Sequence, residues 1–268
     1  MRKAFFLFSL AVAWLGWLAW PAYATSSQAY QDYLYQFDLY RNKYSEFKIA
    51  KNEYEKFKSL ESQTTALEKT KIMLAQRDEL LRAYLFFLNE KLNEDHGLEA
   101  REKQLYQTLI RNEATFLDNH RKLVAAIGSL DDAVTVSQAI ESHYLTFQTT
   151  IRQIIIGVRL GQLTLLANQY DTVLASAKNL VILWRTTFSP QKQATIDRWL
   201  LTITNKRSLY QQKIDKVSRT NSGLRSSSLD ELDQIMGEQQ KNLAEAHQYL
   251  IEGTANLREL MNSLRWND

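Results

Sequence analysis

Four histidines are the side chains in this sequence best suited to acid–base or metal chemistry, because imidazole changes charge near neutral pH and ligates metals. They are His96, His120, His143 and His247. In the helices expected below, His120 shares an apolar face with Phe116, and His247 shares one with Leu243. Two histidines opposed inside a helical bundle can hold a haem iron. A histidine on an apolar face is more often a hydrogen-bonded core residue. The main interpretation therefore assigns no cofactor, and His120 and His247 are the haem ligands of an alternative interpretation.

The sequence contains none of the spacings that other catalytic centres require. A carboxylate-bridged di-iron centre needs Glu three residues before its ligating histidines, but those positions hold Asn93, Leu117, Ile140 and Ala244. There is no H-E-x-x-H, phosphate-binding loop, G-x-S-x-G or dinucleotide fingerprint. The absence of cysteine excludes thiol catalysis, disulfides and cysteine zinc sites. We therefore predict a protein that is not an enzyme, with no catalytic and no metal-binding residues.

The first 24 residues have the order of a secretory signal peptide. Two basic residues, Arg2 and Lys3, precede an apolar run at 4–20, and an A-x-A cleavage site ends at Ala24. We expect residues 1–24 to be removed and the mature chain to be secreted or held in the cell envelope, which means the periplasm in a host with two membranes. The alternative is an uncleaved anchor, because the apolar run approaches the length that spans a bilayer.

Charge and hydropathy argue against two classes of protein. The whole chain has 33 basic and 30 acidic residues, and the loss of Arg2 and Lys3 would leave a net charge of +1. This charge is too small and too evenly spread for nucleic-acid binding. The mature chain lacks an 18-residue apolar run, so we expect no transmembrane segment. Its most apolar stretch, 151–166, leaves contact with a membrane surface open and supports a third interpretation, a membrane-active helical protein. Asp78 and Arg82 are expected to form an exposed pair on one helix.

Turn-forming residues are rare after residue 24, where one proline and seven glycines remain. Strand proteins need such residues about every ten positions, whereas long stretches of Gln, Glu, Lys, Ala and Leu favour helix. The sequence therefore predicts an all-α protein with helices at about 26–60, 66–95, 98–127, 130–187, 190–221 and 228–265. Gly97, in a left-handed position, and Gly128 mark two helix ends. Ser189-Pro190 and Ser228 mark two helix starts.

The predicted helix at 130–187 is much longer than the others and contains no proline or polar turn cluster. We expect one continuous rod that belongs to two elongated antiparallel bundles. The first is a four-helix bundle over 25–158, and the second is a three-helix bundle over 159–268. The alternative is a chain that folds back at Gly157 to Gly161 into one larger bundle.

An aromatic stripe runs along the first predicted helix. At 100° per residue its members fall within about 100° of one another, with alternating spacings of three and four. They are Tyr30, Tyr33, Phe37, Tyr40, Tyr44 and Phe47. A helix packed on a neighbour must keep this register, whereas a binding surface need not, so we predict that the rings are mostly interior. Tyr35 falls outside the stripe. The alternative is that the stripe is a binding surface.

The segment YQDYLYQFDLYRNKYSEF at 30–47, with the helix-forming run that follows it to residue 95, resembles exported, uncharacterised all-helical proteins of ultrasmall candidate-phylum bacteria. The resembling residues include no catalytic motif. The resemblance implies an envelope or extracellular setting and nothing about activity.

These patterns together predict a secreted, non-enzymatic helical-bundle protein that acts as a structural or interaction module of the envelope or the extracellular space. Its partner is expected to be another protein or a second copy of the same chain. The alternative function is that of a ligand-sensing or haem-binding bundle.

Overall fold

The computed structural model describes residues 25–265; the predicted signal peptide at 1–24 and the last three residues lie outside this range. Within it the chain forms six α-helices and no strand, so the predicted all-α fold is confirmed. The helices are α2 (Ser26–Phe57), α3 (Leu60–Glu94), α4 (Ala100–Ala125), α5 (Leu130–Trp184), α6 (Pro190–Ser222) and α7 (Leu229–Arg265), and a 3-10 turn, η1 (Arg185–Thr187), follows α5. None of these helices combines the length and the apolar character that crossing a membrane requires.

Serine caps set the starts of α5 and α6, and the cap of α6 was predicted. Ser129 caps α5 by accepting a hydrogen bond from the Asp132 amide, and the Asp132 carboxylate accepts one from the Gly128 amide. Ser189 caps α6 in the same way, with Pro190 in its first turn. These bonds satisfy amide groups that the first turn of a helix leaves without intrahelical partners.

The turn between α2 and α3 differs from the prediction. α2 ends at Phe57, Lys58 adopts a left-handed conformation with φ 48°, and Ser59 and Ser62 cap each other's amides at the start of α3. The polar patch at 61–65, expected to separate two helices, therefore lies inside α3. Lysine seldom adopts the left-handed conformation, which is why composition did not point to this turn.

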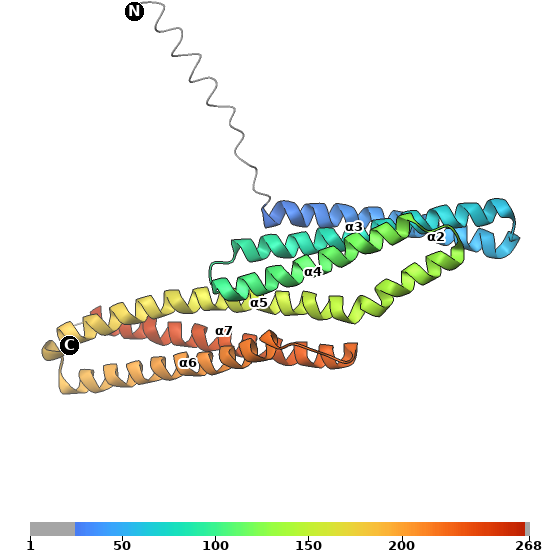
Figure 1. The fold of residues 1–268 in the computed structure, drawn as a ribbon. Coiled ribbons are helices and arrows are strands. Elements are labelled where there is room, and N and C mark those ends of the chain that lie inside the picture. The colour runs from blue at the N-terminus through green and yellow to red at the C-terminus, as the bar shows by residue number, and fades with distance from the viewer. Residues whose placement is uncertain (1–24, 266–268) are drawn as a thin grey trace, which may run out of the picture.

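α5 is one continuous helix of 55 residues, about 82 Å long. Its first part packs against α3 and α4, and its second part packs against α6 and α7 (Figure 1). We call α2, α3, α4 and the first part of α5 the N-terminal half. The second part of α5, with α6 and α7, is the C-terminal half. Ile154 belongs to the core of one half and Ile156 to the core of the other, so the buried face of α5 changes neighbours within two residues. The expected shared rod is present, while the division into domains at residue 158 stays a prediction.

α2 lies at the edge of the N-terminal half, not inside a symmetric four-helix bundle. It packs extensively on α3 alone, whereas α3, α4 and α5 pack on one another (Figure 1). The prediction of an interior aromatic stripe is wrong for Tyr30, Phe37 and Tyr44, which are 43%, 39% and 43% exposed. Tyr35, outside the stripe, is 62% exposed. A regular stripe shows that a helix has a neighbour, but not that the neighbour covers the whole stripe.

Two glycines in the middle of α5 let α4 and the loop before it approach the α5 backbone. The Tyr106 ring of α4 lies over Gly157, where an added Cβ would be 2.4 Å from the ring. The Asp95 carboxylate lies over Gly161, and a Cβ on Gly97 would be 1.8 Å from the Gly161 carbonyl oxygen. Gly97 does not have the predicted left-handed conformation, because no glycine within residues 25–265 has a positive φ. It is needed for close approach instead.

Replacement of Gly97 by alanine should destabilise the fold by about 1 to 3 kcal/mol, because the new methyl group meets backbone atoms that cannot rotate away. Gly237→Ala is the matched control. Gly237 lies inside α7 with nothing within 4 Å of an added Cβ, so alanine there should stabilise the helix by about 0.5 to 1 kcal/mol. Urea unfolding measures both effects, and a Gly97→Ala variant as stable as the unsubstituted chain would contradict the close approach.

Candidate functional site

His120 lies in the core of the N-terminal half, where it pairs with Asp78 of α3. Its Nδ1 is 2.7 Å from an Asp78 carboxylate oxygen, and its Nε2 is 3.0 Å from the Val136 carbonyl oxygen of α5. Both side chains are almost fully buried. A carbonyl oxygen only accepts hydrogen bonds, so Nε2 donates to Val136, and Nδ1 shares the second hydrogen bond with the Asp78 carboxyl group. His120 therefore ties three helices together and keeps no ring nitrogen free to bind iron.

A second histidine–carboxylate pair joins His143 of α5 to Glu113 of α4, with 2.7 Å between Nε2 and the carboxylate oxygen. Glu113 is buried and also accepts a hydrogen bond from the Thr150 hydroxyl at 3.3 Å. The Phe116 ring stacks on the His143 ring at 3.8 Å between centroids and lies 6.3 Å from the His120 ring. The two pairs and Phe116 form one group, the histidine cluster. No three His, Asp or Glu side chains within residues 25–265, these included, lie together as a metal site requires.

The burial of Asp78 corrects the expectation that it pairs with Arg82 at the surface. Arg82 pairs instead with Asp118 of α4, at 2.6 Å. The sequence did contain a sign of this, because Asp78 follows Leu74 by four residues and precedes Leu81 by three, which places it on the leucine face of α3. The carboxylate partners of the histidines, by contrast, lie 30 and 42 residues away from them along the chain.

An apolar cavity of about 310 Å³ lies beside the histidine cluster, lined by all four helices of the N-terminal half. Its lining includes Tyr40 of α2, Arg77 of α3, Phe116 of α4 and Glu141 of α5. Burial lowers the pKa of Arg77. Burial also raises the pKa of Tyr40, against the opposing effect of the positive charge on Arg77. Apolar walls with a few polar groups are typical of small-molecule sites.

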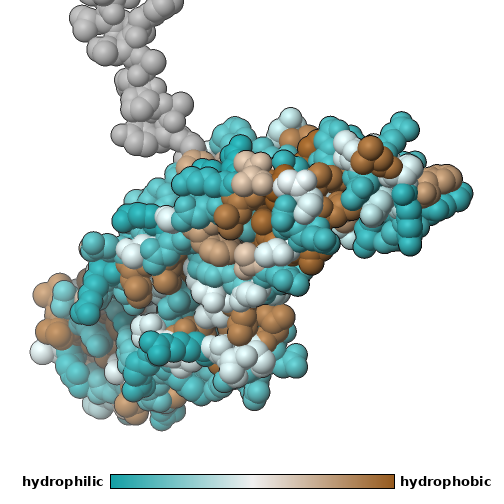
Figure 2. Space-filling view, turned by 45° about the vertical axis from the view of Figure 1, so that its right-hand side comes forward, coloured by the Kyte–Doolittle hydropathy of each residue, from teal (hydrophilic) through white to brown (hydrophobic). Residues whose placement is uncertain are grey.

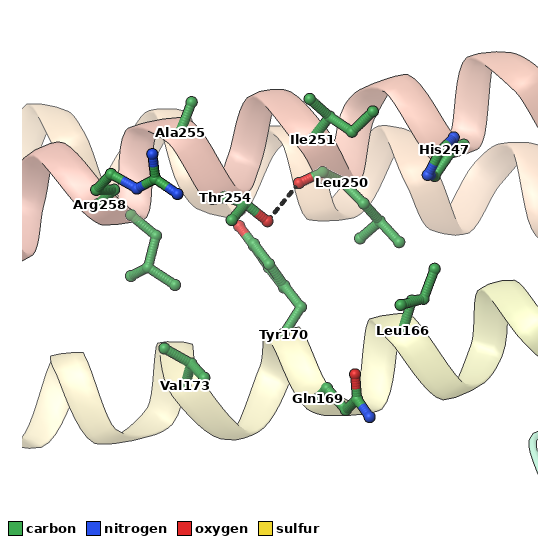
Figure 3. Close-up of a pocket in the computed structure, with 11 residues that line it drawn as sticks. Leu166, Gln169, Tyr170, Val173, His247, Leu250, Ile251, Thr254, Ala255 and Arg258 are labelled. Atoms are coloured by element: carbon green, nitrogen blue, oxygen red, sulfur yellow. Dashed lines mark hydrogen bonds between the residues drawn. The ribbon is translucent and has the colours of Figure 1, made fainter.

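A more open groove of about 500 Å³ lies between α5 and α7 in the C-terminal half. Figure 3 shows Tyr170 standing between the two helices, with His247 on the α7 side. The Tyr170 hydroxyl donates a hydrogen bond to the Ile203 carbonyl at 3.4 Å and packs against Gly253. Burial raises the pKa of Tyr170 to about 12. His247 is exposed, although its stripe suggested a core position. His120 and His247 thus lie in different halves, and the structure does not bring the two candidate haem ligands together.

A buried polar contact joins the two halves. The Asn221 side-chain amide, near the end of α6, donates to the Tyr106 hydroxyl of α4 at 2.9 Å and to the Gln153 carbonyl of α5 at 3.0 Å. The Gln153 side-chain amide donates back to the Asn221 carbonyl at 2.7 Å. All three residues are buried, and burial raises the pKa of Tyr106 to about 12. These directional bonds fix how the halves sit against each other, because a sliding motion would break them.

Three rings of the predicted stripe are exposed on α2, and these three, Tyr30, Phe37 and Tyr44, make up what we call the α2 face. One edge of this face packs on rings of α3, with 5.3 Å between the ring centroids of Tyr30 and Phe87. A cation lies over a second ring, where the Arg41 guanidinium is 6.0 Å from the centroid of Phe37. Figure 2 shows apolar side chains exposed among polar ones on the N-terminal half. The α2 face is therefore an aromatic surface that is anchored on one side only.

Replacement of Asp78 by alanine should destabilise the fold by about 3 to 5 kcal/mol, because it removes one partner of a buried histidine–carboxylate pair and leaves the other unpaired. Asp118→Ala is the control, since it breaks the exposed pair with Arg82 and should cost about 1 kcal/mol or less. Urea unfolding compares the two variants. A loss for Asp78→Ala no larger than that for Asp118→Ala would show that the buried pair does not stabilise the core.

Comparison of the chain with protein-family models, with curated proteins and with solved structures gave no match. What the protein does must therefore be argued from the geometry described above.

Proposed function

We propose that this protein is a secreted, non-enzymatic helical-bundle module of the cell envelope or the extracellular space, and that it binds a protein partner along the α2 face. The observation that carries the proposal is the one-sided packing of α2. Contacts with α3 hold this helix in place, while Tyr30, Phe37 and Tyr44 keep about two fifths of their surface open.

The chemistry of the α2 face suits a protein interface. Tyrosine and arginine are enriched at such interfaces, because a ring offers much apolar area on a stiff side chain and a hydroxyl tolerates water before the partner arrives. The stripe supplies both tyrosines and phenylalanines, and Arg41 and Lys48 lie over the rings of Phe37 and Tyr44. Exposed apolar surface of this kind is a common mark of a binding site.

The shape of α2 favours a helical partner. Its 32 residues make a rod of about 48 Å, and the rings of the α2 face are spread over residues 30–44 of it. An amphipathic helix laid along this stretch would cover the rings as a fourth helix covers a bundle. We therefore assign an amphipathic helix of another protein as the occupant, and self-association through α2 is the competing outcome.

The position of the titratable side chains supports a non-enzymatic role. His120 and Asp78 bond to each other inside the core, and His143 bonds to Glu113. Bonds of this kind hold helices together and leave these groups little freedom to act on a substrate. The proposed location rests on the predicted signal peptide at 1–24, and N-terminal sequencing of exported protein, which should begin at Thr25, tests it.

Glutamine at both Phe37 and Tyr44 should weaken partner binding by about tenfold or more, because buried aromatic residues dominate the binding energy of interfaces. Both rings are more than a third exposed, so the stability of the fold should fall by only about 1 kcal/mol for each. The measurement is capture of partners from the isolated native cell surface, together with sedimentation velocity of the purified protein to detect self-association.

The control carries glutamine at Ile182 and Leu183, two exposed apolar residues near the end of α5 in the C-terminal half. It should capture partners as well as the unsubstituted chain does. Equal capture by the Phe37→Gln/Tyr44→Gln variant, or an equal loss in the control, would mean that the α2 face is not the binding surface. A chain that stays monomeric and captures nothing would remove the support for an interaction module.

A further inference from the structure

The first residue of α2 is hydrogen-bonded to the last residue of α3. The Glu94 carboxylate accepts two hydrogen bonds from Ser26, one from its backbone amide at 2.8 Å and one from its hydroxyl at 2.6 Å. Ser26 is buried, and it lies 68 residues before Glu94 in the chain. The turn at Lys58 joins the other ends of α2 and α3. The contact between Ser26 and Glu94 therefore closes the open end of the helical hairpin that carries the α2 face.

The position of Glu94 benefits α2 and not its own helix. A carboxylate is unfavourable at the C-terminal end of a helix, where the helix dipole is negative, and favourable at an N-terminal end. α2 has no acidic residue in its first turn, whereas α5 has Asp131 and Asp132 in its first turn. Glu94 therefore supplies from α3 the negative charge that the start of α2 lacks. Hydrogen bonds from the Ser26 hydroxyl and amide lower the pKa of Glu94, so its carboxylate is ionised at neutral pH.

Thr25, directly before Ser26, is the residue at which the mature chain is predicted to begin. In the uncleaved chain the Thr25 nitrogen is a neutral amide. Removal of residues 1–24 would turn it into an α-ammonium, whose ordinary pKa of about 7.7 to 8.0 leaves it mostly charged at neutral pH. A positive charge at the start of a helix opposes the helix dipole. The new charge would therefore destabilise the first turn of α2 unless an anion balances it.

The backbone geometry places this nitrogen near Glu94. Thr25 is the N-cap of α2, with φ −78° and ψ 156°. In this extended conformation the backbone nitrogens of Thr25 and Ser26 are about 3.6 Å apart. The Ser26 nitrogen is 2.8 Å from the Glu94 carboxylate. The Thr25 nitrogen therefore lies about 6.5 Å or less from a carboxylate oxygen, which is inside the Debye length of about 8 Å at physiological ionic strength.

We propose that removal of the signal peptide creates an ion pair between the α-ammonium of Thr25 and the Glu94 carboxylate, and that this pair holds the start of α2 on the end of α3. The proposal rests on the predicted cleavage after Ala24 and is independent of what the α2 face binds. Before cleavage the Glu94 carboxylate bonds to Ser26, and after cleavage it also balances the new charge. Since α2 packs extensively on α3 alone, the pair strengthens the attachment of α2 once the chain has been processed.

A double-mutant cycle measures the pair. The chain that begins at Thr25 is compared with the same chain acetylated at its N-terminus, which removes the positive charge, and both are prepared with Glu94 and with Glu94→Gln. Urea unfolding at about pH 6.5, where the α-ammonium is charged, gives the four unfolding equilibrium constants. Acetylation should be more destabilising with Glu94 than with Glu94→Gln, by about two- to fivefold in that constant, the effect of an exposed ion pair. The difference should shrink in about 1 M salt, which screens the pair.

Two controls separate this pair from its neighbours. Lys91→Gln removes another cation, whose Nζ is 3.8 Å from the Glu94 carboxylate, and should leave the coupling between Thr25 and Glu94 in place. A chain that begins at Tyr23 carries its α-ammonium up to about 7 Å farther along the backbone, so acetylation should affect it equally with Glu94 and with Glu94→Gln.

An equal effect of acetylation with Glu94 and with Glu94→Gln, in the chain that begins at Thr25, would overturn the pairing. A coupling just as large in the chain that begins at Tyr23 would also overturn it. Exported protein that begins at a residue other than Thr25 would show that processing does not create the pair, whatever partner the α2 face binds.

Discussion

A helix of 55 residues is too long to be covered by neighbours of 26 to 37 residues along a single stretch, so α5 needs one set of helices over its first part and another over its second. The rest of the fold depends on this constraint. α3 and α4 cover the first part, α6 and α7 cover the second, and the change occurs next to Gly157 and Gly161. Because these two glycines have no side chain, Tyr106 and Gly97 pack directly on the α5 backbone there. The Tyr106–Asn221 hydrogen bond then links the two halves across α5.

The position of α2 follows from the same arrangement. α3, α4 and α5 already enclose a core of three helices, and α2 packs mainly on α3, with Tyr40 and Phe47 against a cluster shared by α3, α4 and α5. This has two consequences for binding. The aromatic stripe stays partly open as the α2 face, and Tyr40 reaches inward to complete the wall of the cavity that holds Arg77. The exposed surface and the cavity thus both border the same aromatic stripe of α2, in which the rings of Tyr40 and Tyr44 are in contact.

Much of the fold could be predicted because local chemistry sets the helix ends. Ser189-Pro190 indicated a helix start, and the lack of any stop between 130 and 187 indicated the long helix. The turn at Lys58 could not be predicted, since a lysine adopts the left-handed conformation at a helix end where glycine is usual. Helical periodicity identified the aromatic stripe of α2 correctly, but it could not show how many helices pack against α2. Only the tertiary structure therefore revealed that Tyr44 is exposed.

The candidate sites were less predictable than the fold. The apolar stripe identified His120 as a core residue, but its partner Asp78 lies 42 residues away, and a pairing at that distance depends on how the helices are arranged. His247 lies on a similar stripe and is exposed, because the groove between α5 and α7 is open where it lies. Arg77 gave no signal at all in the sequence. A basic residue on a helix is ordinarily solvated, and only the packing of four helices encloses its Nε and Nη2.

Small-angle X-ray scattering of the chain from Thr25 onward tests the shared helix most directly. A continuous α5 requires a maximum dimension of about 80 Å or more and a radius of gyration clearly above the value of about 18 Å expected for a compact protein of this length. A radius of gyration near 18 Å would mean that α5 folds back and that the two halves form one compact bundle, which would contradict the account.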